Sequence, residues 1–231
     1  FVTIASTGNA ADFGDMPYVG WATGVSNGTR GIIGGAYYSS GGSIYQTRLD
    51  YFNIATTGQT LQDFGDLTEA RLSKVGTVAS PVRGIWAGGD NPSGDTNIID
   101  YVTMSTLGTA ADFGDLTYAR NNVAGCSNAI RGVFAGGYTN SDPSKDEIDF
   151  ITIATLGDAI DFGDLLSAIS GVNGATSPTR AVFGADITYP ANPTNIIQYV
   201  QIMSTGNAID FGDMVNPMYG TVCSNGHGGL G

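Results

Sequence analysis

Pairs of aspartates are the residues of this chain whose type and spacing most clearly could do chemistry. They flank Phe-Gly in the phrase Asp-Phe-Gly-Asp, which occurs five times, at residues 12–15, 63–66, 112–115, 161–164 and 210–213. Two carboxylates three positions apart on a tight turn could share a hard cation such as Ca²⁺. Alternatively, their oxygens accept backbone N–H groups and fix the turn, with the glycine at positive φ.

The recurrence of the phrase favours the second interpretation, because an architectural turn belongs to every repeat, whereas a functional site usually breaks the symmetry. We therefore expect no metal site and no cofactor. The second aspartate of each copy is expected to be a structural element of the repeat; these are Asp15, Asp66, Asp115, Asp164 and Asp213. Because paired carboxylates also hydrolyse glycosides, a polysaccharide hydrolase is the enzymatic alternative.

Four arginines recur with the same period, and each opens a short apolar segment: Arg30, Arg83, Arg131 and Arg180. A repeated arginine beside a repeated aspartate predicts ion pairs between neighbouring repeats, which would specify register more than stability. A clamp for a substrate carboxylate is the alternative, but binding sites seldom repeat around a whole assembly. We expect the four arginines to be structural.

Nucleophiles and metal-binding side chains are scarce in this sequence. His227 is the only histidine and lies in a glycine-rich segment, no histidine–cysteine cluster has the spacing of a zinc site, and no Gly-x-Ser-x-Gly elbow occurs. Cys126 and Cys223 occupy matching places two repeats apart, so we expect buried thiols rather than a disulfide. These observations predict that the protein is not an enzyme.

Aromatic side chains in or near the loops that vary between repeats are the candidates for ligand binding. Aromatic faces beside Asn, Asp and Ser suit sugar rings; the alternative is that they pack the loops onto a sheet. The candidates are Trp21, Tyr37, Tyr38, Tyr45, Tyr138 and Tyr189. Trp86, by contrast, takes the place of Ile33, Phe134 and Phe183 in other repeats and is expected in the core.

Composition limits the class of partner. The chain has 231 residues and a net charge of −12, with 13% charged and 42% hydrophobic residues. An acidic surface repels phosphate backbones and anionic lipids, so we expect no binding to nucleic acid. No apolar run reaches the length of a membrane span, so we expect no membrane insertion. The 35 glycines suit many short strands joined by tight turns.

The elements that position these residues follow from the step between the five copies, which is 49 to 51 residues. A fixed step of this length is typical of a repeat array. In the third repeat, short strands are expected at residues 116–127, 131–137, 148–155 and 160–164, and no segment has a helical period. A four-stranded sheet that is apolar on both faces must stack against its copies. We therefore predict one all-β domain over residues 1–231, a β-propeller.

Five copies predict five four-stranded blades. Residues 1–6 match part of a third strand and residues 215–224 match a first strand, so the N- and C-terminal segments would pair within one blade and close the ring. Closure would remove exposed strand edges, which promote aggregation. Because the chain starts at Phe1 inside a strand-like pattern, we also expect upstream sequence; a sixth blade built from it is the alternative.

Three successive motifs resemble the kelch repeat: a doubled glycine after a short apolar strand, a Tyr-bearing strand, and a segment ending in Ala-Arg. The resemblance covers essentially the whole chain and implies a β-propeller with about 50 residues per blade. The sequence departs from the kelch pattern in two ways. Phe stands where kelch blades carry a late Trp, and the Arg after Ala survives only as Arg71 and Arg120.

The phrasing of the repeats, with an end that reads Ser-Asn-Gly-His-Gly-Gly, is similar to that of kelch-like proteins encoded by phages. This similarity implies a non-enzymatic structural protein on the virion surface or tail fibre, outside the cell. Its expected partners are other virion proteins and host cell-surface glycans, and it could assemble as a homo-oligomer. A purely structural decoration or spacer without a ligand is the alternative.

Overall fold

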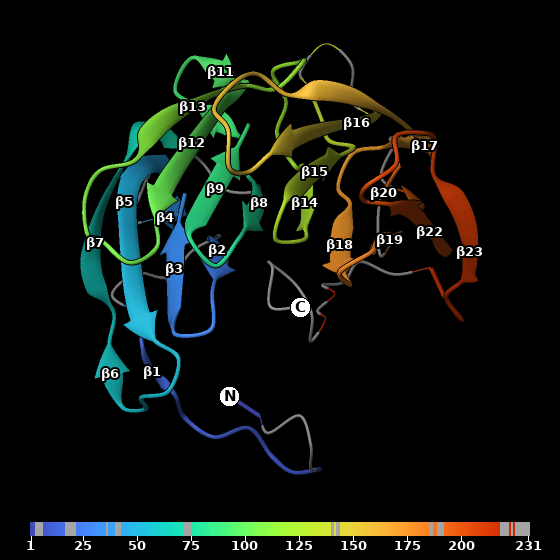
Figure 1. Cartoon of the computed structure of the whole chain (residues 1–231). Helices are drawn as coiled ribbons and strands as arrows, with labels where there is room; N and C mark the ends of the chain where they lie inside the picture. The colour runs from blue at the N-terminus through green and yellow to red at the C-terminus, as the bar shows by residue number, and fades with distance from the viewer. Residues whose placement is uncertain are drawn as a thin grey trace.

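The computed structural model describes residues 1–2, 7–16, 22–35, 37–39, 43–71, 75–139, 141, 144–184, 187–188, 192–217, 222 and 224. Every regular element in this part of the chain is a β-strand, and most strands form four antiparallel sheets (Figure 1). The prediction of an all-β fold is confirmed. The sheets follow one another around an arc like the blades of a propeller, and each blade contains four strands in sequence order.

The blades are numbered in chain order. Blade 1 consists of β2 (Thr23–Ser26), β3 (Arg30–Gly34), β5 (Ser43–Asn53) and β7 (Gln62–Arg71). Blade 2 consists of β8 (Gly76–Ala79), β9 (Arg83–Ala87), β12 (Ile98–Thr103) and β13 (Ala111–Asp115). Blade 3 consists of β14 (Ala124–Ser127), β15 (Arg131–Ala135), β16 (Lys145–Thr152) and β17 (Ile160–Ile169). Blade 4 consists of β18 (Asn173–Thr176), β19 (Arg180–Gly184), β22 (Ile196–Gln201) and β23 (Ile209–Asp213).

Shorter strands decorate this frame. Five of them lie between second and third strands: β4 (Tyr37–Ser39), which pairs with β5, and the hairpins β10 (Asp90–Asn91) with β11 (Gly94–Asp95) and β20 (Ile187–Thr188) with β21 (Asn192–Pro193). One parallel pair joins β1 (Gly14–Asp15) to β6 (Gln59–Thr60). The first strand of each blade lies innermost in the arc, and the fourth lies outermost (Figure 1).

The boundaries predicted for the four strands differ from those observed, and the first strand differs most. Residues 116–127 were expected to be a first strand, but β14 covers only Ala124–Ser127. The preceding residues connect the blades, and in blade 3 the matching residues extend β17 to Ile169 instead. The extension is possible because the register of β17 against β16 shifts between Lys145 and Glu147, which allows Ile169 to pair with Lys145.

The hydrophobic core lies between blades, in three separate clusters. Between blades 1 and 2, Ile32 and Leu49 pack with Trp86, which is fully buried as predicted. Phe134 has the same position between blades 2 and 3, and Phe183 between blades 3 and 4. Each sheet is therefore apolar on both faces and is stabilised by its neighbours, as the stacking argument requires.

Backbone hydrogen bonds join the outer parts of neighbouring blades at what we call the outer joint. Between blades 1 and 2, the Gly108 N–H donates to the Phe64 carbonyl at 2.8 Å, and the Ala110 N–H donates to the Asp66 carbonyl at 2.7 Å. The same two bonds recur at the next two boundaries. Gly65 has a φ of +145°, and a Cβ there would lie 2.3 Å from the Gly108 oxygen, so only glycine fits.

The first aspartate of the repeated phrase fixes this glycine turn. The Asp12 carboxylate accepts the Gly14 N–H at 2.9 Å, and the bond recurs for Asp112, Asp161 and Asp210 at 2.9–3.1 Å. This is the contact that the turn interpretation of the sequence predicts. Within the described residues, no group of three or more His, Cys, Asp or Glu side chains is placed to hold a metal ion.

The repeated arginines cross the blade boundaries, but with partners that differ from the expected aspartates. The Arg30 guanidinium donates to the Met104 carbonyl of blade 2 at 2.7 Å and lies 4.6 Å from the centre of the Tyr51 ring. Arg83 and Arg131 repeat both contacts, and Arg180 lies over the ring of Tyr199. A carbonyl oxygen and a ring face therefore replace the expected carboxylate, because Arg30, on the second strand, points at the end of the next blade's third strand.

The described residues form four complete blades, one fewer than the five predicted. The matching residues at the chain ends lie partly outside the described residues, namely 3–6, 218–221, 223 and 225–231. At the N-terminus, Phe1 and Ala11 exchange backbone hydrogen bonds of 2.7 and 2.8 Å, in the register that pairs Tyr101 with Ala111 in blade 2. The described part of the N-terminal segment therefore has the pairing of third and fourth strands.

Candidate binding surface at the loop end

The loops between second and third strands lie at one end of the propeller, because consecutive strands in each blade are antiparallel. The connections from one blade to the next begin at the same end, and we call it the loop end. In blade 2 the loop contains the hairpin β10–β11, which lies at the top of Figure 1. The loop end is where the chain varies most between repeats, and varied loops on a constant frame are common binding sites.

The β10–β11 hairpin contacts side chains from both neighbouring blades. On one side, the Tyr45 hydroxyl donates to Asp90 at 3.4 Å. On the other side, the Asn121 amide donates to Asp95 at 2.5 Å. Asn91 donates to Glu69 of blade 1 at 3.1 Å. The hairpin is thus tied by side-chain hydrogen bonds to β5, to β7 and to the connection before β14.

Burial shifts the pKa values of the Tyr45–Asp90 pair. Desolvation raises the pKa of Asp90 above its usual value, and the nearby Asp95 raises it further. Desolvation also raises the pKa of Tyr45, followed by the effect of Asp90. The phenol therefore stays protonated near neutral pH and can act as the hydrogen-bond donor.

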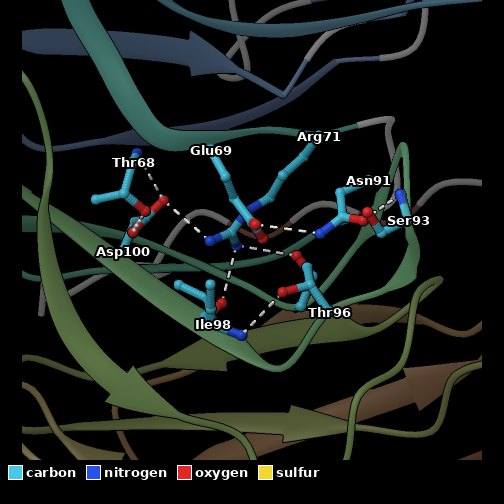
Figure 2. A network of polar contacts seen from close by, with 9 residues as sticks. Thr68, Glu69, Arg71, Asn91, Ser93, Thr96, Ile98 and Asp100 are labelled. Carbon is cyan, nitrogen blue, oxygen red and sulfur yellow. Dashed lines mark hydrogen bonds and ion pairs between the residues drawn. The ribbon is translucent and has the colours of Figure 1, made fainter.

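A buried arginine holds both ends of the blade 2 loop. The Arg71 guanidinium donates to the carbonyls of Gly88 and Ile98, where the loop begins and ends, at 3.0 and 2.9 Å. It also donates to the Asp100 carboxylate at 3.0 Å, and Thr68 donates to the same carboxylate (Figure 2). Arg71 lies at the end of β7 in blade 1, so the loop is fixed by its neighbouring blade.

Blade 3 repeats this arrangement in part, and blade 4 replaces it. Arg120 donates to the carbonyl of Glu147 in β16 at 3.2 Å, to that of Phe134 in β15 at 3.4 Å and to Asp149 at 2.9 Å. At the next boundary Ile169 stands in place of the arginine and Gln198 in place of the aspartate. Gln198 is fully buried and accepts the Leu166 N–H at 2.7 Å.

Burial opposes the charges of both arginine–aspartate pairs. Desolvation raises the pKa of Asp100 and Asp149 above the usual value, although the paired arginine and a threonine hydroxyl act in the opposite direction. Desolvation also lowers the pKa of Arg71 and Arg120. In all four groups desolvation outweighs the attraction of the partner, so neither charge would be tolerated alone at these sites.

Of the six aromatic candidates, Tyr45 and Tyr138 have side chains that the structure describes. Tyr45 is the member that contacts a neighbouring loop, through Asp90. Tyr138 is half-buried, and its backbone forms a bridge with Asn121. Trp21 and Tyr189 lie outside the described residues; Tyr37 and Tyr38 belong to β4, but their side chains lie outside the description.

Two features of the loop end were missed by the sequence reasoning. Arg71 and Arg120 were noted only as remnants of a motif, although they anchor the loops. Tyr118 was placed in a strand, but it lies in the connection after β13 with 53% of its surface exposed. The Lys145 ammonium lies 5.5 Å from the centre of its ring. The sequence feature that could have identified Tyr118 as exposed is its position three residues after the repeated Asp-Phe-Gly-Asp phrase, where the connection to the next blade begins.

A small cavity lies on the propeller axis, away from these loops. Its volume is about 320 Å³, and the four innermost strands line it together with Val222 and Ser224. The Cys126 thiol is buried in its wall, and desolvation raises its pKa to about 12. The thiol is therefore protonated at neutral pH and is a poor nucleophile.

Among the described residues, there is no helix with the length and apolar character needed to cross a membrane. No protein-family model matches the chain, and no curated protein matches it.

Proposed function

We propose that this chain is a kelch-like β-propeller of a phage virion surface or tail fibre, which binds host glycans or other virion proteins without catalysing a reaction. The observation that carries the binding role is the anchoring of the blade 2 loop at both ends by Arg71, together with the bonds of Arg120 to the two strands that flank the blade 3 loop. Loops held at both ends lose less conformational entropy when a ligand binds. The viral setting is supported by the resemblance of the repeat motifs.

The chemistry of the loop end suits a carbohydrate. Tyr118 exposes its ring beside the Lys145 ammonium, and sugar rings pack on such aromatic faces. Asp90, Asn91 and Asp95 on the neighbouring hairpin supply acceptors and donors for sugar hydroxyls. These groups come from rigid strands and short turns rather than from one deep cavity, so we expect a shallow site.

Five blades are part of the proposal. Phe13 accepts the Gly58 N–H at 2.8 Å, which is the bond of an outer joint on the free side of blade 1. Ser224 accepts the Thr176 N–H at 3.2 Å beside blade 4, and Ser127 makes the same contact with Ala79 beside blade 2. These two contacts support a further blade whose outer strand would contain Phe13 and whose inner strand would contain Ser224.

Glycan binding by loop variants tests this function. The 231-residue chain is applied to an array of bacterial surface polysaccharides, and Kd is measured for any glycan bound. A combined variant, Tyr118→Ala with Asp90→Asn, should lose at least about tenfold in affinity, which corresponds to about 1.4 kcal/mol. Ile130→Ser is the matched control, because Ile130 is equally exposed in the turn between first and second strands, at the opposite end.

Two experimental outcomes would contradict the proposed glycan-binding role and favour a different function. If no glycan binds and host adsorption is unchanged after replacement of the β10–β11 hairpin, a structural spacer is the better assignment. If incubation with a polysaccharide releases reducing ends, the protein is a glycoside hydrolase, and the carboxylates of the repeats become its candidate acids.

A further inference from the structure

Strand β23 of blade 4 exposes a surface that is covered in the other blades. Phe211 is 54% exposed, whereas the equivalent Phe64, Phe113 and Phe162 are 2–3% exposed. Gly212 and Gly163 share a φ of +139°. A Cβ on Gly163 would lie 2.6 Å from the Gly206 backbone, whereas no described atom lies within 4 Å of the same point at Gly212.

At the outer joint of blades 3 and 4, the equivalent strand β17 is covered by residues 204–208 of blade 4. Residues 204–208 read Ser-Thr-Gly-Asn-Ala. The Gly206 N–H donates to the Phe162 carbonyl and the Ala208 N–H to the Asp164 carbonyl, both at 2.7 Å. The Asn207 side-chain oxygen accepts the Asp164 N–H at 3.1 Å. Backbone and side chain together specify this docking.

The N-terminal segment contains a second copy of this docking sequence. Residues 6–10 also read Ser-Thr-Gly-Asn-Ala, and residues 7–10 are exposed. Phe13, three residues further on, contacts Phe52 of blade 1 with ring centres 5.3 Å apart. The N-terminus lies on the open side of the arc, between blades 1 and 4 (Figure 1).

We propose that Gly8, Asn9 and Ala10 bind the free edge of β23 in the same chain and close the propeller. The Gly8 N–H donates to the Phe211 carbonyl, the Ala10 N–H donates to the Asp213 carbonyl, and the Asn9 amide oxygen accepts the Asp213 N–H. The same chain is favoured over a second copy because its N-terminal segment is already held on blade 1, which raises its effective concentration. This inference rests on the five-bladed ring proposed above but does not depend on whether a glycan binds.

Hydrogen exchange of the unmodified chain tests the joint directly. Gly206 and Ala208 supply an internal reference with the same local sequence. If the joint forms, the amides of Gly8 and Ala10 should be protected to within about tenfold of this reference, measured by NMR on a sample shown to be monomeric by sedimentation. Exchange of both amides at the rate of an unstructured peptide would overturn the proposal. Protection that appears only in a dimer or larger assembly would also overturn it, in favour of joining between copies.

Matched substitutions give a second measurement. Phe211→Ala should lower the urea midpoint of unfolding as much as Phe162→Ala does, although Phe211 alone is exposed at the open edge. Gly212→Ala should lower it as much as Gly163→Ala, because both glycines share the same φ and differ only in what covers them. If the substitutions at residues 211 and 212 lower the urea midpoint only slightly, while those at 162 and 163 lower it strongly, the outer edge of β23 stays uncovered.

Discussion

The Arg71 guanidinium donates a hydrogen bond to the Asp100 carboxylate across the boundary between blades 1 and 2, with a nitrogen–oxygen distance of 3.0 Å. Both side chains are fully buried. Because the same guanidinium also holds the carbonyls of Gly88 and Ile98, it joins blade packing to the geometry of a loop at the proposed binding surface. The pair is therefore a test of both stability and function.

Replacing one partner should be far more harmful than replacing both. Arg71→Ile leaves the buried Asp100 without its cation and should lower the free energy of unfolding by about 3–5 kcal/mol. The double variant Arg71→Ile with Asp100→Gln copies the natural combination of Ile169 and Gln198, so it should recover much of this loss. Urea unfolding of both variants gives the two values. A double variant as unstable as the sum of the single changes would contradict the assigned coupling.

The stacked arginines should not tolerate lysine. Arg131 donates to the Ile202 carbonyl at 3.0 Å while its guanidinium lies 4.2 Å from the centre of the Phe150 ring. A lysine ammonium lacks the planar group that makes both contacts at once. Arg131→Lys should therefore lower the free energy of unfolding by about 1–3 kcal/mol. Repeating the change in a Phe150→Leu background isolates the ring contact; equal losses in the two backgrounds would show that the ring contributes nothing.

Acidification from neutral pH should stabilise the protein. The pKa is raised above its usual 3.8 for five aspartates, with desolvation the largest cause in each: Asp90, Asp100, Asp115, Asp149 and Asp164. A raised pKa in the folded state means that the folded protein binds more protons than the unfolded chain just above pH 3.8, so stability falls as pH rises through that window. The urea midpoint should therefore be higher at about pH 5 than at about pH 7.

A single substitution checks the source of this pH dependence. The raised pKa of Asp164 comes from desolvation and then from Asp146, Asp161 and Glu147. Asp164→Asn removes one of the five groups and should reduce the difference between the two midpoints. A midpoint that is lower at the more acidic pH, in the parent protein, would show that carboxylates with lowered pKa values dominate instead.

The repeat period predicts the positions of the blades well, because each strand can be recognised from the types of a few consecutive residues. The glycine turn after Asp112, the buried Phe134 strand and the burial of Trp86 all follow from residue type and repetition. The role of Arg71 could not be predicted in this way, since its partners Gly88 and Asp100 lie 17 and 29 residues further along, in the next blade.

The partners of the other arginines are also distant in the sequence and could not be predicted from the repeat period. Arg30 and the repeated aspartates share a period, and the period alone suggested that they pair. The antiparallel order of the strands instead places Arg30 beside Met104, 74 residues away, and over Tyr51. The aromatic candidates were chosen by type and loop position, and neither property reports exposure. Tyr118, which is 53% exposed, was not among them, and the candidate Tyr138 is half-buried.

The Ser127 hydroxyl should be essential to the inner edge of the propeller. The Ala79 N–H donates to the Ser127 oxygen at 3.2 Å, and the Ser127 hydroxyl donates to the Ala79 carbonyl at 2.9 Å. Ala79 lies on β8, whose free edge faces the axis, so this hydroxyl satisfies a donor and an acceptor that no further strand reaches. Ser127→Ala should lower the free energy of unfolding by about 1–3 kcal/mol, since both Ala79 groups are left unpaired in a buried position.

Thr77 provides the matched control for Ser127. Its hydroxyl donates only to the Gly24 carbonyl, at 3.2 Å and in an exposed position on the same inner edge. Water can replace that bond, so Thr77→Val should change the free energy of unfolding by less than about 1 kcal/mol. Urea unfolding of the two variants measures the difference. Equal effects would mean that the inner edges are open to water at both positions, and that the blades are held together by their apolar faces and outer joints alone.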